Sequence, residues 1–121
     1  MSSKQITYIV THADDDPEMA SIPFVLANTA VAMDVTPVII LQGKAVMLAM
    51  KGYAEHIHFE GFNPLMDMIK SYVEAGNKLL VCTPCMNKRK IKVEDLIEGA
   101  EAIGGAKVNE IVLGSDAVLT Y

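Results

Sequence analysis

The sequence contains the stretch Thr36-Pro37-Val38-Ile39-Ile40-Leu41, and this stretch decides the fold class. Its last four residues are all apolar, and three of them are branched at Cβ. A strand with one face in water alternates polar and apolar residues, whereas an uninterrupted apolar run is typical of a strand covered on both faces, as in parallel sheets. The stretch therefore predicts a central strand with helices on both sides of its sheet.

Four more strands are predicted around this one, at Ile6–Val10, Lys78–Cys82, Ala100–Ile103 and Ala117–Tyr121. Helical segments are expected between them, at Ile22–Met33, Gly43–Lys51, Asn63–Ala75, Thr83–Arg89, Val93–Glu98 and Ala106–Leu113. Strands that alternate with helices require right-handed crossovers. The expected fold is therefore an α/β three-layer αβα sandwich with a mainly parallel five-stranded sheet, built as a single domain over residues 1–121.

Proline and cap residues refine the helix boundaries. Pro17 suits the first turn of a helix, but Pro23 lies too deep for a straight helix that begins there, so we expect a broken start with Ser21 as the N-cap. Asn63 is expected to cap the helix that Pro64 opens. Residues Tyr53–Phe62 carry no regular pattern and could include a short strand.

Composition limits the classes of function. The chain has 121 residues, of which 51% are apolar, and a net charge of −5. It can bury a core and is expected to self-associate, while its acidic balance argues against nucleic acid as a partner. The polar start Met1–Gln5 does not resemble a signal peptide, and no apolar run reaches the ~18 residues of a membrane span, so we expect a cytoplasmic protein with no membrane partner.

Three loops should meet at one edge of the sheet, because parallel sheets bind ligands beyond the carboxyl ends of their strands. These loops are His12–Asp16, Gln42-Gly43 and Cys82–Cys85. The acidic turn Asp14–Asp16 is interpreted as a solvated helix start rather than a cation site. His12 could donate to a bound anion or deprotonate a thiol.

The pair in Cys82-Thr83-Pro84-Cys85 carries the most specific chemistry in the chain. A buried strand leads up to it and Pro84 lets a helix start at once. A helix start, with Lys88, Arg89, Lys90 and Lys92 nearby, would favour thiolate over thiol. A thiolate is the species that attacks sulfur.

Other interpretations of the cysteines remain open. Both could be buried core residues. A thioredoxin-type dithiol fits the spacing, but the chain has no Trp and no proline after Pro84. Zinc would need two histidines from His12, His56 and His58, without the usual ligand spacing. We therefore expect no metal and no cofactor.

Four stretches together resemble the DsrE/DsrF-like family, which includes TusD- and YchN-type proteins. They are Asp15–Ala20 with Pro23–Ala27, Thr36–Leu41 with Gly43, Leu80–Ile91, and Leu96–Gly99 through Ser115–Tyr121. Arg89-Lys90 departs from the Arg-Gly that often follows the cysteine helix in this family.

The resemblance implies a homotrimer or homohexamer that carries sulfane sulfur as a persulfide in a sulfur relay with donor and acceptor proteins. Cys82 falls at the position of the TusD-type sulfur-carrying cysteine, and Cys85 would be a resolving thiol or second acceptor. His12, Gln42, Lys88 and Arg89 are the expected anion- or substrate-binding residues. The alternative is a non-catalytic oligomeric binding module with structural or redox-sensitive cysteines.

Overall fold

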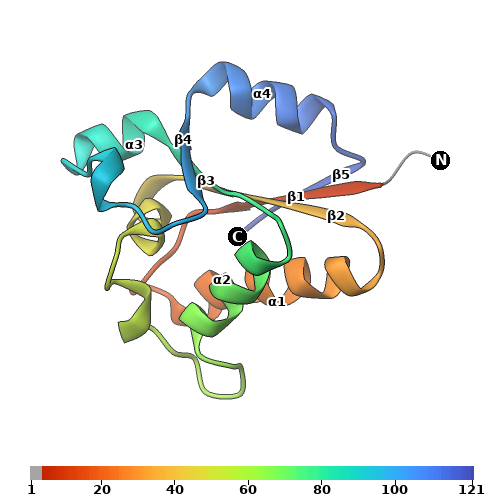
Figure 1. The fold of residues 1–121 in the computed structure, drawn as a ribbon, viewed down its shortest axis with the longest axis horizontal. Coiled ribbons are helices and arrows are strands. Elements are labelled where there is room, and N and C mark those ends of the chain that lie inside the picture. Colours follow the sequence, from red (N-terminus) through yellow and green to blue (C-terminus); the bar gives the residue numbers. More distant parts are fainter. Residues whose placement is uncertain (1–3) are drawn as a thin grey trace.

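A five-stranded sheet forms the centre of the protein in a computed structural model that describes residues 4–121. The strands are β1 (Gln5–Val10), β2 (Thr36–Leu41), β3 (Leu79–Cys82), β4 (Ala100–Ile103) and β5 (Ala117–Thr120). Their order is β4-β3-β2-β1-β5, and every neighbouring pair is parallel (Figure 1). The predicted α/β class and five-stranded parallel sheet are confirmed.

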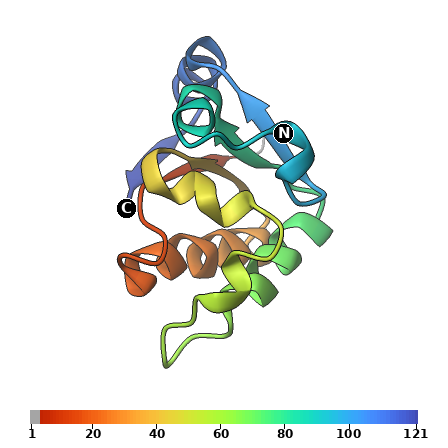
Figure 2. The ribbon, with the colours of Figure 1, turned by 90° about the vertical axis from the view of Figure 1, so that its left-hand side faces the viewer.

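Helices cover both faces of the sheet. On one face lie α1 (Pro17–Ala32), α2 (Leu65–Glu74) and the 3-10 helix η1 (Gly43–Ala49), and on the other lies α4 (Gly105–Leu113) (Figures 1 and 2). The short α3 (Thr83–Lys88) follows β3, and single 3-10 turns occur at η2 (Ala54–His56) and η3 (Val93–Asp95). No helix within residues 4–121 is long and apolar enough to cross a membrane.

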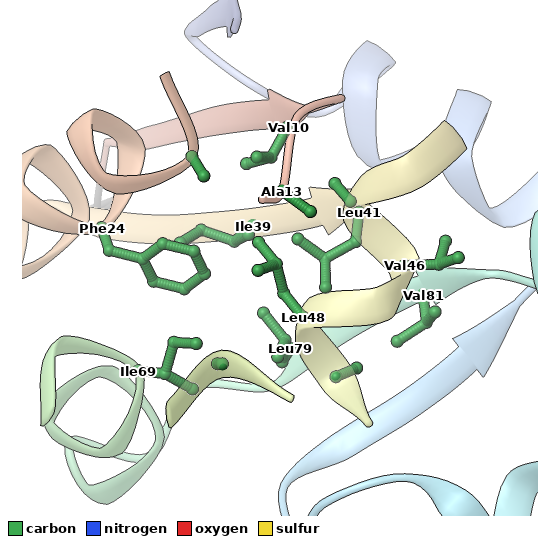
Figure 3. Close-up of a cluster of buried hydrophobic side chains, with 14 of the residues drawn as sticks. Val10, Ala13, Phe24, Ile39, Leu41, Val46, Leu48, Ile69, Leu79 and Val81 are labelled. Carbon is green, nitrogen blue, oxygen red and sulfur yellow. The ribbon is translucent and has the colours of Figure 1, made fainter. Parts of the chain in front are cut away.

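The main core lies between the sheet and the α1, α2 and η1 layer. Phe24 of α1, Leu48 of η1 and Ile69 of α2 converge there on the inner side chains of β2 and β3 (Figure 3). A smaller cluster on the opposite face joins Ile40, Leu80 and Ile103 to Val108 and Ile111 of α4. Residues 39–41 of β2 are completely buried, which confirms the prediction that this strand is covered on both faces.

The first helix differs from the sequence-based expectation. It runs unbroken from Pro17, with Pro23 inside it, and its N-cap is Asp16, whose Oδ1 accepts from the Met19 N–H at 3.2 Å. Ser21 is not a cap but a buried residue within the helix. Proline costs one main-chain hydrogen bond, and the burial of Phe24 and its neighbours on the sheet outweighs that loss.

Other local predictions were also corrected. Gly43–Lys51 is a 3-10 helix that ends at Ala49, in which the buried pairs Ala45/Leu48 and Val46/Ala49 have the three-residue period of that helix. Val93–Glu98 contains only the turn η3. Asn63 makes no cap, because Pro64 takes that position, and Tyr53–Phe62 holds η2 rather than a strand. In each of these short segments, the secondary structure is set by packing against the rest of the protein rather than by local sequence.

Candidate functional site

The three predicted loops meet at the carboxyl edge of the sheet. β1, β2 and β3 are adjacent, and Leu41 lies in register with both Val10 and Val81. The Gly43 N–H donates to Cys85 Sγ at 3.3 Å, which joins the second loop to the third. Lys44 Nζ lies 3.1 Å from Asp14 Oδ1, which joins the second loop to the first. The topology therefore gathers these loops into one rim.

The two cysteines lie side by side in the third loop. Cys82 ends β3 and is the N-cap of α3, and Cys85 lies in the first turn of that helix. Both are free thiols and both are half-buried. Burial raises the pKa of the Cys82 thiol, and so does its hydrogen bond to the Cys85 side chain, while the main-chain N–H of Cys85 and, more weakly, the Arg89 charge lower it. The positive potential expected from the helix start and the basic residues is thus outweighed at Cys82 by burial. The reasons are that α3 has only six residues and that Cys82 is partly withdrawn from water.

Gly43 is a site residue whose chemical role was not predicted from the sequence. Its φ of +56° is in the left-handed region, which a glycine adopts without penalty. A Cβ built at this position would lie 3.9 Å from the Thr11 carbonyl oxygen. Gly43 therefore lies between the end of β1 and Cys85, and its N–H is directed at a sulfur rather than at the sheet. A glycine two positions after the end of β2 was the only sequence signal for this contact.

The basic residues predicted beside the cysteines lie at the surface. Arg89 Nη1 donates to the Cys85 carbonyl oxygen at 3.2 Å, so its guanidinium is held next to the cysteine turn. Lys88 is exposed and forms no ion pair within the part of the chain that the structure describes. Gln42 is half-buried at the end of β2, where its N–H donates to the Val10 carbonyl at 2.9 Å. Arg89 is thus the predicted cation with a defined place at the cysteines.

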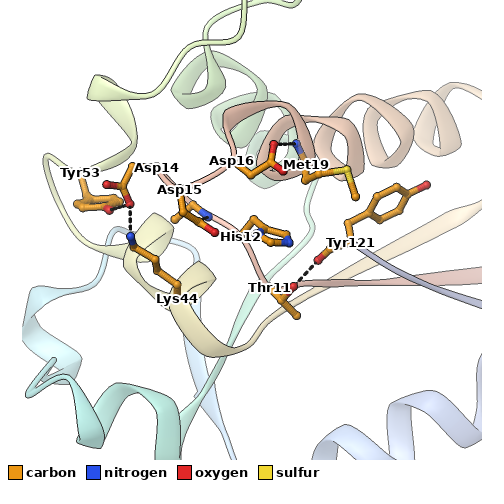
Figure 4. A network of polar contacts seen from close by, with 10 residues as sticks. Thr11, His12, Asp14, Asp15, Asp16, Met19, Lys44, Tyr53 and Tyr121 are labelled. Carbon is orange, nitrogen blue, oxygen red and sulfur yellow. Dashed lines mark hydrogen bonds and ion pairs between the residues drawn. The ribbon is translucent and has the colours of Figure 1, made fainter.

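His12 is oriented by a carboxylate in its own loop (Figure 4). Its Nδ1 lies 2.7 Å from Asp15 Oδ2, and the other oxygen of Asp15 accepts from the Ala13 N–H at 2.8 Å. The Ala13 N–H and the His12 ring lower the pKa of Asp15 to about 2. Asp15 is therefore ionised at neutral pH and favours the His12 tautomer with the proton on Nδ1. This leaves Nε2 as an acceptor.

A second polar cluster fastens the first loop to η1 and η2. Asp14 Oδ1 accepts from Tyr53 Oη at 2.6 Å and pairs with Lys44 (Figure 4). These two hydrogen bonds lower the pKa of Asp14, and burial together with Asp14 raises the pKa of Tyr53 to about 12. Tyr53 belongs to a segment, Tyr53–Phe62, for which the sequence predicted no regular structure. Its role here is to position the loop.

Within residues 4–121, no three His, Cys, Asp or Glu side chains come together in a group that could hold a metal ion. The zinc interpretation of Cys82 and Cys85 with two histidines therefore gains no support from the geometry. The carboxylates of the first loop face their own partners instead. Asp14 contacts Tyr53 and Lys44, and Asp16 caps α1.

The sequence profile of the DsrE/DsrF-like family matches residues 4–121. The chain belongs to this family. The resemblance identified from the four stretches is thereby confirmed, and it extends over the whole described part of the chain. Membership in the DsrE/DsrF-like family is consistent with a function related to sulfur relay.

Individual relatives agree with this assignment. The chain is 33% identical over 117 residues to the uncharacterized protein MJ0989 of Methanocaldococcus jannaschii, covering 97% of this chain and 99% of the relative. It is 29% identical over 100 residues to the uncharacterized protein MJ0760 of the same organism, covering 83% of this chain but only 36% of that longer relative. The chain therefore spans about a third of one relative and nearly all of the other.

Solved structures share the fold at low sequence identity. The crystal structure of ychN protein from E. coli superposes with a TM-score of 0.77 at 18% identity, covering 99% of this chain and 100% of that chain. The structure of MTH1491 from Methanobacterium thermoautotrophicum, described as a protein of unknown function, gives a TM-score of 0.72 at 13% identity, with 99% and 100% covered. These likenesses establish the α/β architecture of the DsrE/DsrF-like chain.

Proposed function

We propose that this DsrE/DsrF-like protein is a cysteine-based sulfur carrier that holds sulfane sulfur as a persulfide on Cys82, with Cys85 as resolving thiol or second acceptor. The observation that carries the proposal is the placement of both thiols at the carboxyl edge of the sheet, within hydrogen-bonding reach of each other. Membership in a family consistent with sulfur relay supports the same conclusion.

Sulfur transfer requires an attacking thiolate and a second thiolate that leaves. The rim of loops at the carboxyl edge holds polar side chains near the cysteines that can stabilise such charges. A cysteine thiolate attacks the sulfane sulfur of a persulfide or polysulfide, a new S–S bond forms, and the donor leaves as its own thiolate. Arg89 lies close enough to the cysteine turn to stabilise the anionic species. His12, whose ring is oriented on the same rim by Asp15, presents its Nε2 as a hydrogen-bond acceptor.

The test is mass spectrometry of the intact protein after incubation with inorganic polysulfide or thiosulfate and removal of the donor. We expect the wild type to retain one extra sulfur atom and Cys82→Ser to retain none. Cys85→Ser provides the matched control, because it keeps the storage site and loses only its neighbour. Equal retention of sulfur in Cys82→Ser and the wild type would refute the assignment to Cys82.

We also propose that the protein acts as a homo-oligomer, a trimer or hexamer as the family resemblance implies. The supporting observation is the edge strand β5, in which every residue is exposed, with Val118 38% and Leu119 42% accessible. Leu113 at the end of α4 is 87% exposed. Unpaired apolar edge strands are usually covered in native proteins, and a second copy of this chain would cover this one.

A second candidate function is a non-catalytic oligomeric binding module whose cysteines are structural or redox-sensitive. The partial burial of Cys82 and its raised pKa favour this alternative, because an un-ionised thiol does not attack sulfur. Thiol labelling separates the two functions. A carrier reacts with iodoacetamide near neutral pH in the native state, whereas a structural pair reacts only after unfolding.

A further inference from the structure

We propose that Cys85, held by the main-chain N–H of Gly43, is the first acceptor of sulfur, and that it passes the sulfur to Cys82 for storage. This inference rests on the proposed carrier function and divides that function between the two thiols. It also assigns a chemical role to Gly43, whose N–H stabilises the negative charge on Cys85 Sγ.

The contact between Gly43 and Cys85 joins separate parts of the chain. The Gly43 N–H lies 3.3 Å from Cys85 Sγ, across 42 positions of sequence. The ladder between β1 and β2 ends at the Gln42 N–H, which is bonded to Val10, so the next N–H is free to point at the sulfur. A hydrogen bond that a main-chain N–H donates to a sulfur favours the anionic form of that sulfur.

Cys82 has the opposite setting. It is partly withdrawn from water at the end of β3, and the neighbouring Cys85 side chain hydrogen-bonds to it. Both effects raise the pKa of the Cys82 thiol and together outweigh the main-chain N–H of Cys85, which lowers it, so Cys82 holds its proton more tightly than an ordinary thiol. The pair therefore consists of a stabilised thiolate at Cys85 and a more basic thiol at Cys82.

Two balanced steps follow from this division. In the first, the Cys85 thiolate attacks the outer sulfur of a persulfide or polysulfide, and the donor leaves as its own thiolate. In the second, Cys82 loses its proton to water and attacks the outer sulfur of the Cys85 persulfide. The S–S bond to Cys85 breaks, and its electron pair returns to Cys85 Sγ beside the Gly43 N–H. No external oxidant or reductant is needed.

The direction of transfer follows from leaving-group strength. The thiol that forms the more stable thiolate leaves faster, while the more basic thiol retains the sulfur. Gly43 stabilises the Cys85 thiolate, so Cys85 gives sulfur up readily. Cys82 also has a main-chain partner, the Cys85 N–H, but burial and the Cys85 side chain outweigh it and leave Cys82 the more basic thiol, which makes it the better place of storage. The same reasoning explains why the chain carries two cysteines one helical turn apart.

The first measurement is the order of alkylation in the wild-type protein. A limiting amount of iodoacetamide is added across pH 6–9, and the tryptic peptide Leu79–Lys88 is fragmented to locate the label. We expect Cys85 to be labelled about tenfold faster than Cys82 at the lower pH, and the preference to narrow as pH rises. Labelling of Cys82 first, or of both at one rate, would overturn the inference.

The second measurement compares two glycine variants. Gly43→Ala strains the backbone that directs the Gly43 N–H at Cys85. Gly52→Ala is the control, because Gly52 also has a positive φ, of +80°, and no atom lies within 4 Å of the new Cβ. We expect Gly43→Ala to lose most of the preference for Cys85 and Gly52→Ala to keep it. If the relative labelling rates of Cys85 and Cys82 depend on pH in Gly43→Ala as they do in the wild type, the Gly43 N–H does not have the proposed role.

Sulfur uptake separates this inference from the carrier function. The initial rate of uptake from inorganic polysulfide should fall about tenfold in Cys85→Ser, which still stores sulfur on Cys82. Cys82→Ser should load as fast as the wild type, but the released donor thiolate then attacks the outer sulfur again and Cys85 leaves as its own thiolate, so this variant should hold no sulfur once the donor has been withdrawn. If Cys85→Ser loads at the wild-type rate, the inference fails and the carrier function stands. If no form of the protein gains sulfur, the carrier function itself fails, while the alkylation order still tests the ionisation of Cys85.

Discussion

Tyr72 shows how one side chain can hold the sheet and a helix together. It is completely buried in α2, and its ring meets Phe24 of α1 edge-on, with centroids 6.2 Å apart. Its hydroxyl accepts from the Ile39 N–H at 2.9 Å and donates to the Lys78 carbonyl at 2.7 Å. Burial raises the pKa of Tyr72 strongly, so the hydroxyl keeps its proton and remains a donor at neutral pH.

Tyr72→Phe should lower the free energy of unfolding by about 1–3 kcal/mol, because the buried N–H of Ile39 loses its partner. Urea unfolding followed by circular dichroism measures this change. Tyr8→Phe is the matched control, since the Tyr8 hydroxyl makes a single long bond of 3.4 Å to the Leu26 carbonyl. Equal decreases in the free energy of unfolding of the two variants would show that the two hydrogen bonds of Tyr72 contribute no more to stability than the single bond of Tyr8.

At the scale of elements, the approach of β4 to α2 depends on one glycine. Gly99 precedes β4 with φ +92°, and a Cβ built there would lie 2.4 Å from Cγ1 of Val73 on α2. The Gly99 carbonyl accepts from the Leu79 N–H at 2.9 Å, which starts the pairing of β3 with β4. A side chain at this position would meet the side chain of Val73, so either Val73 shifts or α2 and the sheet move apart.

Gly99→Ala should therefore cost about 1–3 kcal/mol more stability than Gly76→Ala. Gly76 has a similar φ of +96°, but nothing lies within 4 Å of its new Cβ, so the pair isolates packing from backbone strain. Thermal or urea unfolding of both variants measures the difference. Similar stabilities would mean that Val73 moves aside at little cost.

At the scale of the whole molecule, the two edges of the sheet differ. The β5 edge exposes apolar side chains on both of its faces, whereas η3 near the opposite edge exposes Val93, 68% accessible, among charged neighbours. Because of this asymmetry, we expect the proposed homo-oligomer to assemble through the β5 edge.

The double variant Val118→Lys with Leu119→Lys should lower the mass of the assembly, because buried ammonium groups are costly at an interface. Size-exclusion chromatography with light scattering at micromolar concentration provides the measurement. Val93→Lys makes the same chemical change away from β5 and should leave the assembly intact. A monomeric wild type would refute the proposed homo-oligomer. If only Val93→Lys dissociates the assembly, the interface lies near η3 and not at the β5 edge.

The sequence by itself determined the architecture. The buried run of β2 requires cover on both faces, and the alternation of strands and helices allows few arrangements other than a parallel sheet. It also located the rim, because Cys82 and His12 each follow a strand and parallel strands end at one edge. These features depend on local pattern, which a sequence displays directly.

Only the tertiary structure decided the continuity of α1 through Pro23, the 3-10 form of η1, and the identity of Asp16 as a cap. It alone placed the Gly43 N–H on Cys85 and the Tyr53 hydroxyl on Asp14. The last two contacts join residues 42 and 39 positions apart, and a main-chain donor such as the Gly43 N–H carries no side-chain signal in the sequence. The burial of Cys82, which raises the pKa of its thiol, likewise depends on neighbours that the local pattern around Pro84 does not reveal.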